Sequence, residues 1–425
     1  MTDRLAAELI DAIRSGRLLP GALFPSQRSL AESAGTSRST VAAALDDLSR
    51  RGWAESRRKA RFVARLPDAS RQGLHPAHAL SDSPRERARV AAPAAELSAA
   101  YLRAHSRLPE HLQSDGRVRG GLVELRQLIA DRYSASGLPT SAEQVVITTG
   151  AMGAFAAILE ATRGTVVVED PTYHGALEHL RRRRRRVVAW QRDSNWDLDA
   201  LASLVSANSP ALVYAVPDFH NPTGHLADEN ERALLASFAS GTMIVVDETL
   251  RELHLDPAEP LPSHTASHHP VVVTISGLSK TVWSGLRLGW IRYPDNPNDH
   301  LDAALDIHPA PIMEQLVAIE LWPHLDRITE ERCQLLRHQR DVMIAALTDA
   351  GFHAEAPRGG LVCWVDLGRS ADSVAASLNS EDRSIAPGMR FSTSGSYRNH
   401  VRLPFTGTVE EIGKTVEALR RLVRK

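Results

Sequence analysis

The sequence has few cysteines and no long apolar stretch, and each absence excludes a class of protein. Its 425 residues include two cysteines, Cys333 and Cys363, without the close spacing of a zinc-ligand set or a disulfide framework. No apolar run approaches the roughly 18 residues needed to span a bilayer. The N-terminus, MTDRLAAELI, has acidic residues and lacks the apolar core of a signal peptide. We therefore expect a soluble cytoplasmic protein without a metal site.

The chain also has almost no net charge, −1 at pH 7, so the molecule as a whole gives no argument for binding nucleic acid. The charge is uneven, however. The first 65 residues contain 12 Lys and Arg and 7 Asp and Glu, a surplus of 12 − 7 = 5. A small basic head on a neutral body suggests that only the head meets an anionic polymer. The length predicts two or three domains.

The head, residues 1–65, has the element order of a winged helix-turn-helix. Apolar residues at helical spacing within residues 3–14 predict a first helix, and a Pro/Gly-rich turn precedes a short second helix around QRSLAESAG. The segment TSRSTVAAALDDLSRRG then starts with cap candidates and carries Val41, Leu45 and Leu48 at helical spacing. Finally, WAESRRKARFVAR indicates two short strands around a basic turn, the wing.

The third predicted helix has the composition that a recognition helix needs. Small or polar residues in its first turn let the backbone enter the major groove, and arginines contact phosphates or guanine edges. With the helix before it and the wing after it, the predicted DNA-contacting residues are Arg28, Ser37, Arg38, Ser39, Thr40, Arg57, Arg58 and Lys59. Taken singly, each also fits an ordinary solvated side chain on a small helical bundle.

As a series, the head resembles the N-terminal domain of GntR-type transcription regulators over about residues 2–65. The resemblance rests on the order and spacing of Gly16, Pro20-Gly21, Pro25-Ser26, Arg28, Leu30-Ala31, Gly35, Ser37-Arg38, Thr40-Val41, Leu45, Leu48 and Gly52. It implies binding to a double-stranded DNA operator. One departure lies in the wing, where RRKAR replaces the glycines that such regulators often have at the hairpin tip.

The rest of the chain predicts a linker and an α/β body. Residues 66–92 are polar and aperiodic, as in a linker, and in the body, residues 93–425, apolar runs alternate with helical patterns. Five runs predict strands buried on both faces: QVVITTG, TVVVED, ALVYAVP, MIVVDE and VVVTIS. This alternation predicts a large lobe, about residues 110–300, with a mainly parallel sheet covered by helices. Residues 301–425 predict a small C-terminal α+β lobe, with GGLVCWVDL and HVRLPF as its strand-like segments.

A run of six arginines, residues 181–186, follows the helical pattern GALEHL. We interpret it as a helix C-terminus whose cations face solvent and favour the helix dipole. Contact with nucleic acid or another anionic surface is the alternative.

Polar residues that suit pyridoxal phosphate follow several of the predicted strands. This aldehyde cofactor requires a lysine amine, a carboxylate at its ring nitrogen, a donor to its ring hydroxyl, an aromatic face and an anion site. The segment TTGAMGAF offers a helix start for the phosphate, and EDPTYHG offers an aromatic ring. The segment PDFHNPTG offers an amide, and MIVVDE offers a carboxylate that is costly to bury without a partner. Lys280 follows the last strand, in ISGLSKTVW. Open α/β sheets bind ligands at these strand ends.

The series resembles the fold-type I pyridoxal-phosphate family, the aspartate aminotransferase-like enzymes, over about residues 95–425. The resemblance implies that Lys280 forms the internal aldimine with pyridoxal 5'-phosphate, that Asp247 pairs with the ring nitrogen, and that Asn221 donates to the ring hydroxyl. It implies further that Tyr173 stacks on the ring and that the phosphate is held by Ala151, Met152, Ser279 and Arg287. With Asn221, Arg402 in HVRLPF falls where these enzymes bind the substrate, and a bidentate arginine suits an α-carboxylate.

Three departures count against efficient transamination. The segment DETLREL offers Thr249 and Leu250, and no tyrosine, to contact the ring hydroxyl. The segment DGRVRGG has Arg117 and Arg119 where a tyrosine of the neighbouring subunit would reach the phosphate. Gly277 replaces the serine or threonine that is common three residues before the lysine.

A GntR-type head, a linker and an aminotransferase-like body form the layout of MocR-type transcription regulators, which the whole chain resembles. The resemblance implies a head-to-tail homodimer, associated with the bacterial nucleoid when bound to DNA. In it, a small amine or amino-acid effector forms an aldimine with the cofactor held at Lys280 and changes operator binding. Two alternatives remain open: a catalytically active aminotransferase with an accessory head, and a DNA-binding protein whose body no longer holds the cofactor. Whether the body retains transaminase activity stays open as well.

Overall fold

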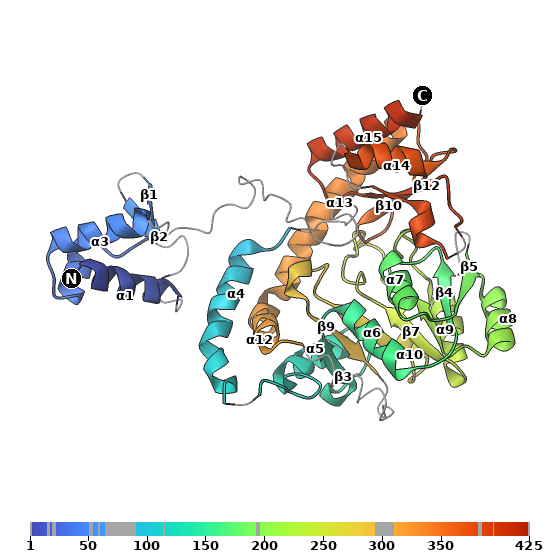
Figure 1. The fold of residues 1–425 in the computed structure, drawn as a ribbon, viewed down its shortest axis with the longest axis horizontal. Helices are drawn as coiled ribbons and strands as arrows, with labels where there is room; N and C mark the ends of the chain where they lie inside the picture. Colours follow the sequence, from blue (N-terminus) through green and yellow to red (C-terminus); the bar gives the residue numbers. More distant parts are fainter. Residues whose placement is uncertain are drawn as a thin grey trace. The chain divides into compact units, whose positions relative to one another are not determined.

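The computed structural model describes residues 2–14, 18, 23–50, 54–57, 60–63, 91–113, 115–192, 196–293, 310–380, 385–393 and 395–423 (Figure 1). The described residues of 1–80 and 93–115 form one compact unit, and those of 81–92 and 116–425 form the other. No helix within these ranges combines the length and the apolar character that crossing a membrane requires. Of the predicted linker, only residues 91 and 92 lie within the described ranges.

The head forms three helices and a hairpin in the predicted order. The helices are α1 (Thr2–Arg14), α2 (Gln27–Ser33) and α3 (Arg38–Arg50), and the strands β1 (Ala54–Arg57) and β2 (Ala60–Val63) pair antiparallel. They share one apolar core, made of Leu5, Ala6, Leu9, Phe24, Ala31, Val41, Ala44, Leu45, Leu48 and Ala54. The predicted winged helix-turn-helix is therefore confirmed.

Hydrogen bonds fix the two helix starts of the helix-turn-helix. Ser26 Oγ accepts from the amide of Ser29 at 3.1 Å, and Ser37 Oγ accepts from the amide of Thr40 at 3.1 Å. Between the two helices, Gly35 has a φ of +57°, the left-handed conformation that glycine adopts without a steric penalty. The turn and the start of α3 are thus set by local sequence.

The second unit is built on a seven-stranded sheet with the order β3-β9-β8-β7-β6-β4-β5. Its strands are β3 (Val145–Thr148), β4 (Val166–Asp170), β5 (Val187–Gln191), β6 (Leu212–Ala215), β7 (Met243–Asp247), β8 (Val273–Gly277) and β9 (Gly289–Arg292). Neighbours from β5 to β8 are parallel, whereas β9 is antiparallel to both β8 and β3. The mainly parallel sheet is confirmed with its five predicted strands. Strand β5 was not among these five, and strand β9, which was not predicted, makes the sheet mixed.

Helices accompany the strands of this sheet (Figure 1). They are α5 (Val123–Ala135), α6 (Ala151–Ala161), α7 (His174–Arg182), α8 (Leu198–Asn208), α9 (Glu229–Ser237), α10 (Thr265–His268) and α12 (Ile312–Leu321). Helix α4 (Ala94–Arg107) belongs to the first unit. Helices α6 and α7 pack on one sheet face in a cluster that includes Val245 of β7. Because side chains alternate along a strand, Asp247 shares this face, and Glu248 faces the opposite side. The hydrogen bonding between β7 and β8 extends to Glu248, whose amide donates to the carbonyl of Ile275 at 2.9 Å.

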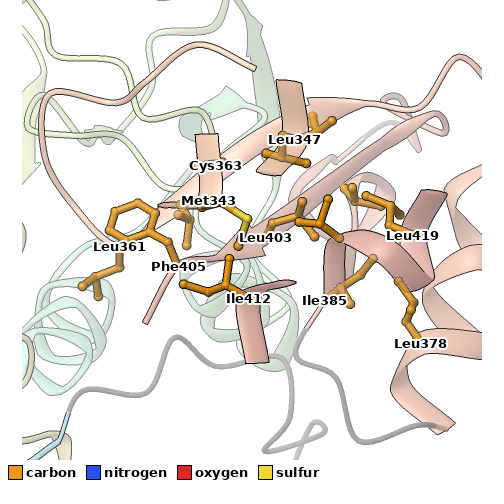
Figure 2. Close-up of a cluster of buried hydrophobic side chains, with 14 of the residues drawn as sticks. Met343, Leu347, Leu361, Cys363, Leu378, Ile385, Leu403, Phe405, Ile412 and Leu419 are labelled. Carbon is orange, nitrogen blue, oxygen red and sulfur yellow. The ribbon is translucent and has the colours of Figure 1, made fainter. Parts of the chain in front are cut away.

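The C-terminal lobe combines helices with a three-stranded antiparallel sheet of order β10-β12-β11. Its elements are α13 (Leu325–Asp349), β10 (Val362–Asp366), α14 (Ala371–Ser380), β11 (Ala386–Pro387), β12 (His400–Pro404) and α15 (Val409–Val423). Figure 2 shows part of its core, with Met343, Leu347, Leu361, Cys363, Leu378, Ile385, Leu403, Phe405, Ile412 and Leu419. The predicted small α+β lobe and both of its strand segments are confirmed.

The arginine run at 181–186 begins at the C-terminal end of α7. Arg182 is exposed and its Nε lies 2.7 Å from Glu178 Oε1, one turn earlier, as expected for a solvated helix end. Arg185 differs from the prediction, because its guanidinium donates to the carbonyl oxygens of Leu159, Thr162 and Gly164. It therefore satisfies carbonyl groups at the end of α6 that have no partner within that helix.

Candidate functional site

Asp247 is the central residue of the candidate cofactor site, at the C-terminal end of β7. Its buried carboxylate accepts hydrogen bonds from the Tyr214 hydroxyl at 2.8 Å, from the Thr249 amide at 3.0 Å and from the Thr249 hydroxyl. Burial raises the pKa of Asp247, while these hydrogen bonds and the charge of Lys280 act in the opposite direction. A buried carboxylate of this kind favours a cationic partner such as a protonated ring nitrogen.

Lys280 lies in the turn after β8, near enough for its charge to lower the pKa of Asp247. Strands β8 and β9 approach each other closely before this turn, where Gly277 is paired with Gly289. A Cβ on Gly277 would lie 2.7 Å from a backbone oxygen of the segment leading into β9. A serine or threonine three residues before the lysine is therefore excluded by packing, which explains this departure.

The N-terminus of α6 is the predicted anion site, and it lies near this turn. Gly150 precedes the helix with a φ of +86°. The first amides of the helix, those of Ala151 and Met152, have no carbonyl one turn earlier to bond, so they are available to a phosphate. The absence of a side chain on Gly289 lets β9 approach this helix start, since a Cβ there would lie 2.7 Å from the Ala151 nitrogen.

Ser279 and Arg287 belong to the loop that joins β8 to β9. Ser279 is half-buried beside Lys280, whereas Arg287 is exposed, with a φ of +51°. Burial, then the charges of Arg183, Arg182 and, more weakly, Arg287, lower the pKa of His179. The charge of Arg287 thus acts on a side chain of α7. Its contact with a phosphate, and that of Ser279, stay predictions.

A second group of predicted residues meets around Arg402, on β12. Arg402 is 3% exposed, and its guanidinium carbon lies 4.9 Å from the ring centroid of Phe391. Its Nη1 donates to Asn221 Oδ1 at 3.3 Å. Burial lowers the pKa of Arg402 to about 10, although the nearby Tyr173 acts in the opposite direction. Asn221 and Tyr173 of the large lobe therefore lie beside an arginine of the small lobe.

Tyr214 joins these two groups. Burial raises the pKa of Tyr214, and so do Asp247 and, more weakly, Tyr173. The Tyr173 ring lies over Gly175, where a Cβ would be 2.5 Å from the ring. The structure thus gathers the predicted Lys280, Asp247, Tyr173, Asn221 and Arg402 through contacts and charges of neighbouring side chains.

Tyr214 and the hydroxyl of Thr249 are site groups that sequence reasoning missed. The only signal for Tyr214 was a hydroxyl in the otherwise apolar strand ALVYAV. Thr249 was noted, but without the role of donating to Asp247. Leu250 packs in the core of the small lobe. This turn therefore offers no phenol to the ring hydroxyl of a cofactor, and the missing tyrosine is not replaced here.

The loop before α5 contains the two arginines at the position of the neighbouring-subunit tyrosine. Arg117 and Arg119 are exposed. Gly121, which follows them, has a φ of +92°, and a Cβ there would lie 2.4 Å from Ile147 Cγ1. The backbone of this loop is thus held against β3 at Gly121, close to the two arginines in the sequence.

The start of α3 presents the predicted DNA-contacting residues of the recognition helix. Ser37, Arg38 and Ser39 are exposed and Thr40 is half-buried. The Ser37 hydroxyl lies 2.7 Å from the Ser39 hydroxyl and 2.8 Å from the Thr40 hydroxyl. These small polar side chains leave the first turn of α3 narrow enough to approach a groove floor.

Arg28 and the wing residues complete the predicted set. Arg28 is exposed in α2, and its Nε lies 2.9 Å from Glu32 Oε1. Since an exposed ion pair of this kind contributes little to stability, Arg28 can exchange Glu32 for a phosphate at small cost. Arg57 ends β1, but its side chain, like Arg58 and Lys59, lies outside the described residues.

The donor set of the body fits pyridoxal phosphate. A lysine, a buried carboxylate and an aromatic ring lie near one another. The N-terminus of α6, preceded by Gly150, lies beside the strand end that leads to this group. The head and the body thus each offer a separate binding chemistry.

Comparisons with known proteins agree with this division. Residues 117–419 match the family "Aminotransferase class I and II", and residues 1–63 match "Bacterial regulatory proteins, gntR family". The chain is 28% identical to the HTH-type transcriptional regulator YjiR of Escherichia coli, over 98% of each chain. It is 27% identical to the 2-aminoadipate transaminase of Thermus thermophilus, over 72% of this chain and 79% of that protein.

Among solved structures, the fold is similar to that of LysN, an α-aminoadipate aminotransferase from Thermus thermophilus complexed with N-(5'-phosphopyridoxyl)-L-leucine. The TM-score is 0.70 at 27% identity, and the likeness covers 78% of this chain and 88% of that one. The chain therefore belongs to the class I and II aminotransferase family, and its gntR-family head gives it the arrangement of a MocR-type, helix-turn-helix transcription regulator.

Proposed function

We propose that the protein is a DNA-binding transcription regulator that holds pyridoxal phosphate at Lys280 and changes its operator affinity when a small amine or amino acid engages the cofactor. The observation that carries the proposal is the cluster of Lys280, Asp247, Asn221, Tyr173 and Arg402 in a chain with a gntR-family head. Transamination alone requires no such head, and DNA binding alone requires no buried carboxylate beside a lysine.

The residues around Asp247 would hold the cofactor ring. When bound, pyridoxal phosphate supplies an electrophilic carbon that condenses with a primary amine. Asp247 would keep the ring nitrogen protonated, because burial disfavours its charge unless a cation is adjacent. Asn221 would donate its Nδ2 to the ring hydroxyl, since its Oδ1 already accepts from Arg402. Tyr173 would stack on the ring.

The phosphate would lie at the N-terminus of α6. The amides of Ala151 and Met152 would donate to it there, and the positive end of the helix dipole favours an anion. Ser279 would add a hydroxyl and Arg287 a charge-assisted hydrogen bond. Because Arg287 is exposed, it can approach the phosphate from solvent.

Arg402 would bind the carboxylate of an amino-acid effector. With a pKa of about 10, its guanidinium stays charged at neutral pH. Its Nη1 donates to the neutral amide oxygen of Asn221, and a carboxylate is a stronger acceptor in a buried site. We therefore expect amino acids to bind more tightly than simple amines of the same size.

Effector binding at Arg402 would act on the contact between the two lobes. The Thr172 amide donates to the carbonyl of Phe391 at 2.8 Å, and the Thr393 hydroxyl donates to Asp170 Oδ2 at 3.0 Å. Phe391 is also the ring that contacts Arg402. A shift of Arg402 would move this segment, and couplings between such sites are typically about 1–3 kcal/mol.

We further propose a head-to-tail homodimer in the bacterial cytoplasm, associated with the nucleoid when bound to DNA. Two heads would read two half-sites of an operator, and their spacing would change with the arrangement of the bodies. Arg117 or Arg119 of one subunit would reach the cofactor phosphate of the other, in the position where the enzymes have a tyrosine.

The test combines a spectroscopic screen with DNA binding. Amines and amino acids are screened for a shift in the absorbance of the bound cofactor, and operator DNA is selected from a random-sequence library. A ligand that shifts the spectrum should change operator affinity about 5-fold or more, and Lys280→Ala should remove both effects. If every spectrally active ligand leaves operator affinity unchanged, the switch is refuted while cofactor binding stands.

A working transaminase is the second candidate, favoured by the identity with the 2-aminoadipate transaminase and by the retained Arg402. The absence of a phenol at the turn after Asp247 counts against it. Steady release of a keto acid at ordinary enzyme rates, roughly 1–10³ per second, would establish it.

A further inference from the structure

A cavity lies on the face of the sheet opposite Asp247. Its volume is about 530 Å³, within the usual range for small-molecule sites. Its floor includes Glu248, Ser276 and Trp290, which follow or belong to the adjacent strands β7, β8 and β9. Because side chains alternate along strands, these three face away from the side of Asp247, so the cavity is separate from the cofactor site.

Glu248 gives this cavity an unsatisfied acceptor. The residue is 3% exposed, and its Oε2 lies 2.8 Å from His264 Nδ1. Its Oε1 is buried and has no hydrogen-bond partner among the described residues. A buried carboxylate oxygen without a donor is unfavourable, so a ligand or a water that donates to it is expected.

The cations around the cavity are already paired. Arg132 contacts Glu252 and lies 2.7 Å from Asp326. Arg251 lies 3.0 Å from Asp218 and donates to a backbone carbonyl at 2.7 Å. An anionic ligand would have to break these pairs, whereas a cationic ligand would meet an acceptor that has no donor. Arg251 is also near enough to Glu248 for their charges to interact. The lining nevertheless holds three carboxylates, those of Glu248, Glu252 and Asp326, and two arginines, so it favours a cation.

Part of the cavity wall is apolar. Ile129 and Tyr133 of α5, with Leu261 and Trp290, line the cavity, and Trp290 Nε1 donates to the Tyr133 hydroxyl at 3.1 Å. We propose that the cavity binds a small organic amine in its protonated form, which donates an N–H to Glu248 Oε1 and packs its hydrocarbon part against these walls. Since Glu248 directly follows Asp247, an occupant is placed to influence the cofactor carboxylate.

A tertiary amine tests the proposal independently of the cofactor. N,N-dimethyl-2-phenylethylamine carries one N–H donor when protonated, but it cannot condense with an aldehyde. Isothermal titration calorimetry of the full-length protein at pH 7 should detect one site per chain. Glu248→Gln should weaken binding about 10-fold or more, because the charge-assisted hydrogen bond is lost. The neutral 2-phenylethanol should bind the wild type more weakly by a similar factor.

Glu331→Gln is the matched control, because Glu331 is an exposed carboxylate of α13 paired with Arg327 and does not line the cavity. It should leave the affinity within about 3-fold. If Glu248→Gln does not fold, Ala135→Trp replaces it, since Ala135 is an exposed residue of the cavity wall and a bulky ring there should block binding. Any of three results would overturn the proposal and leave a cavity that holds only water. The first is equal affinity of the wild type and Glu248→Gln for the tertiary amine, and the second is undiminished binding by a folded Ala135→Trp. The third is no binding to the wild type at millimolar probe.

Discussion

Glu231 holds the loop that carries Asn221, and its pKa gives a quantitative test of this role. The loop runs from β6 to α9, and the Glu231 side chain is 11% exposed. Its carboxylate accepts from the amides of Trp196 at 2.8 Å and Asp228 at 2.9 Å, and it lies 3.1 Å from His225 Nε2. One carboxylate therefore links His225 and Asp228, two points of the segment after Asn221, to Trp196.

The size of the effect follows from the pKa of Glu231. Burial alone would raise it, but the hydrogen bonds and the charge of His225 outweigh burial and lower the pKa from 4.5 to about 2. The difference between these two pKa values corresponds to about 3 kcal/mol of folding free energy. Because the folded-state pKa is the lower one, this stability is present above about pH 4.5 and is lost as the pH falls toward 2.

The perturbation is Glu231→Gln, which keeps the shape of the side chain and removes its charge. It should lower the free energy of unfolding by about 3 kcal/mol at pH 7 and by about 1 kcal/mol at pH 3. Urea unfolding followed by tryptophan fluorescence measures both values. Asp199→Asn, an exposed carboxylate in the first turn of α8, is the control and should change stability by less than about 0.5 kcal/mol. A loss that is the same at both pH values would refute the electrostatic explanation.

Three further substitutions test the site and the head. Asp247→Asn should weaken cofactor binding without lowering the stability of the cofactor-free protein, since burial already disfavours the charge of Asp247. Equilibrium dialysis measures the cofactor affinity and thermal unfolding measures the stability. Unchanged cofactor affinity would contradict the assignment of Asp247 to the cofactor ring. Arg402→Lys should weaken the binding of amino-acid effectors about 10-fold or more and that of simple amines much less, because only amino acids have a carboxylate for a bidentate guanidinium. A spectral titration measures both affinities. Equal losses of affinity for the two classes would argue against a carboxylate site at Arg402. Arg38→Ala should abolish operator binding in fluorescence anisotropy at full cofactor content, and unchanged DNA affinity would contradict the assignment of the recognition helix.

Much of the fold was predictable because its strands are apolar and buried on both faces. Runs such as TVVVED and MIVVDE have no polar alternation, and they became β4 and β7 of the parallel part of the sheet. Strand β9 was missed because its sequence, GWIR, is short and directly follows the loop of Lys280. Its pairing with β3 depends on contacts between segments more than 100 residues apart, which local pattern does not encode.

The proximity of Lys280 and Asp247 was predictable, because Asp247 ends and Lys280 follows a buried strand of the parallel sheet, and such strand ends meet at one edge. Residues that act on those groups were not. Tyr214 donates to Asp247 from a strand 33 residues earlier, and in the sequence it is one more large residue in a buried run. The sequence also did not explain why glycine occupies position 277. The backbone leading into β9 approaches this residue too closely to allow a side chain, and a contact between two segments is not visible in the local sequence.

Asp247 and Glu248 are adjacent carboxylates whose different surroundings become clear only in the structure. Both carboxylates end the same apolar run, and only the family resemblance distinguished Asp247 from Glu248. Alternation along the strand puts Asp247 on the face with Lys280, where a tyrosine and a threonine donate to it. The same alternation puts Glu248 on the other face, where His264 reaches one oxygen and the other has no donor among the described residues. Two adjacent acids thus face opposite sides of the sheet, and a cation bound to either one would act on a backbone segment that both share.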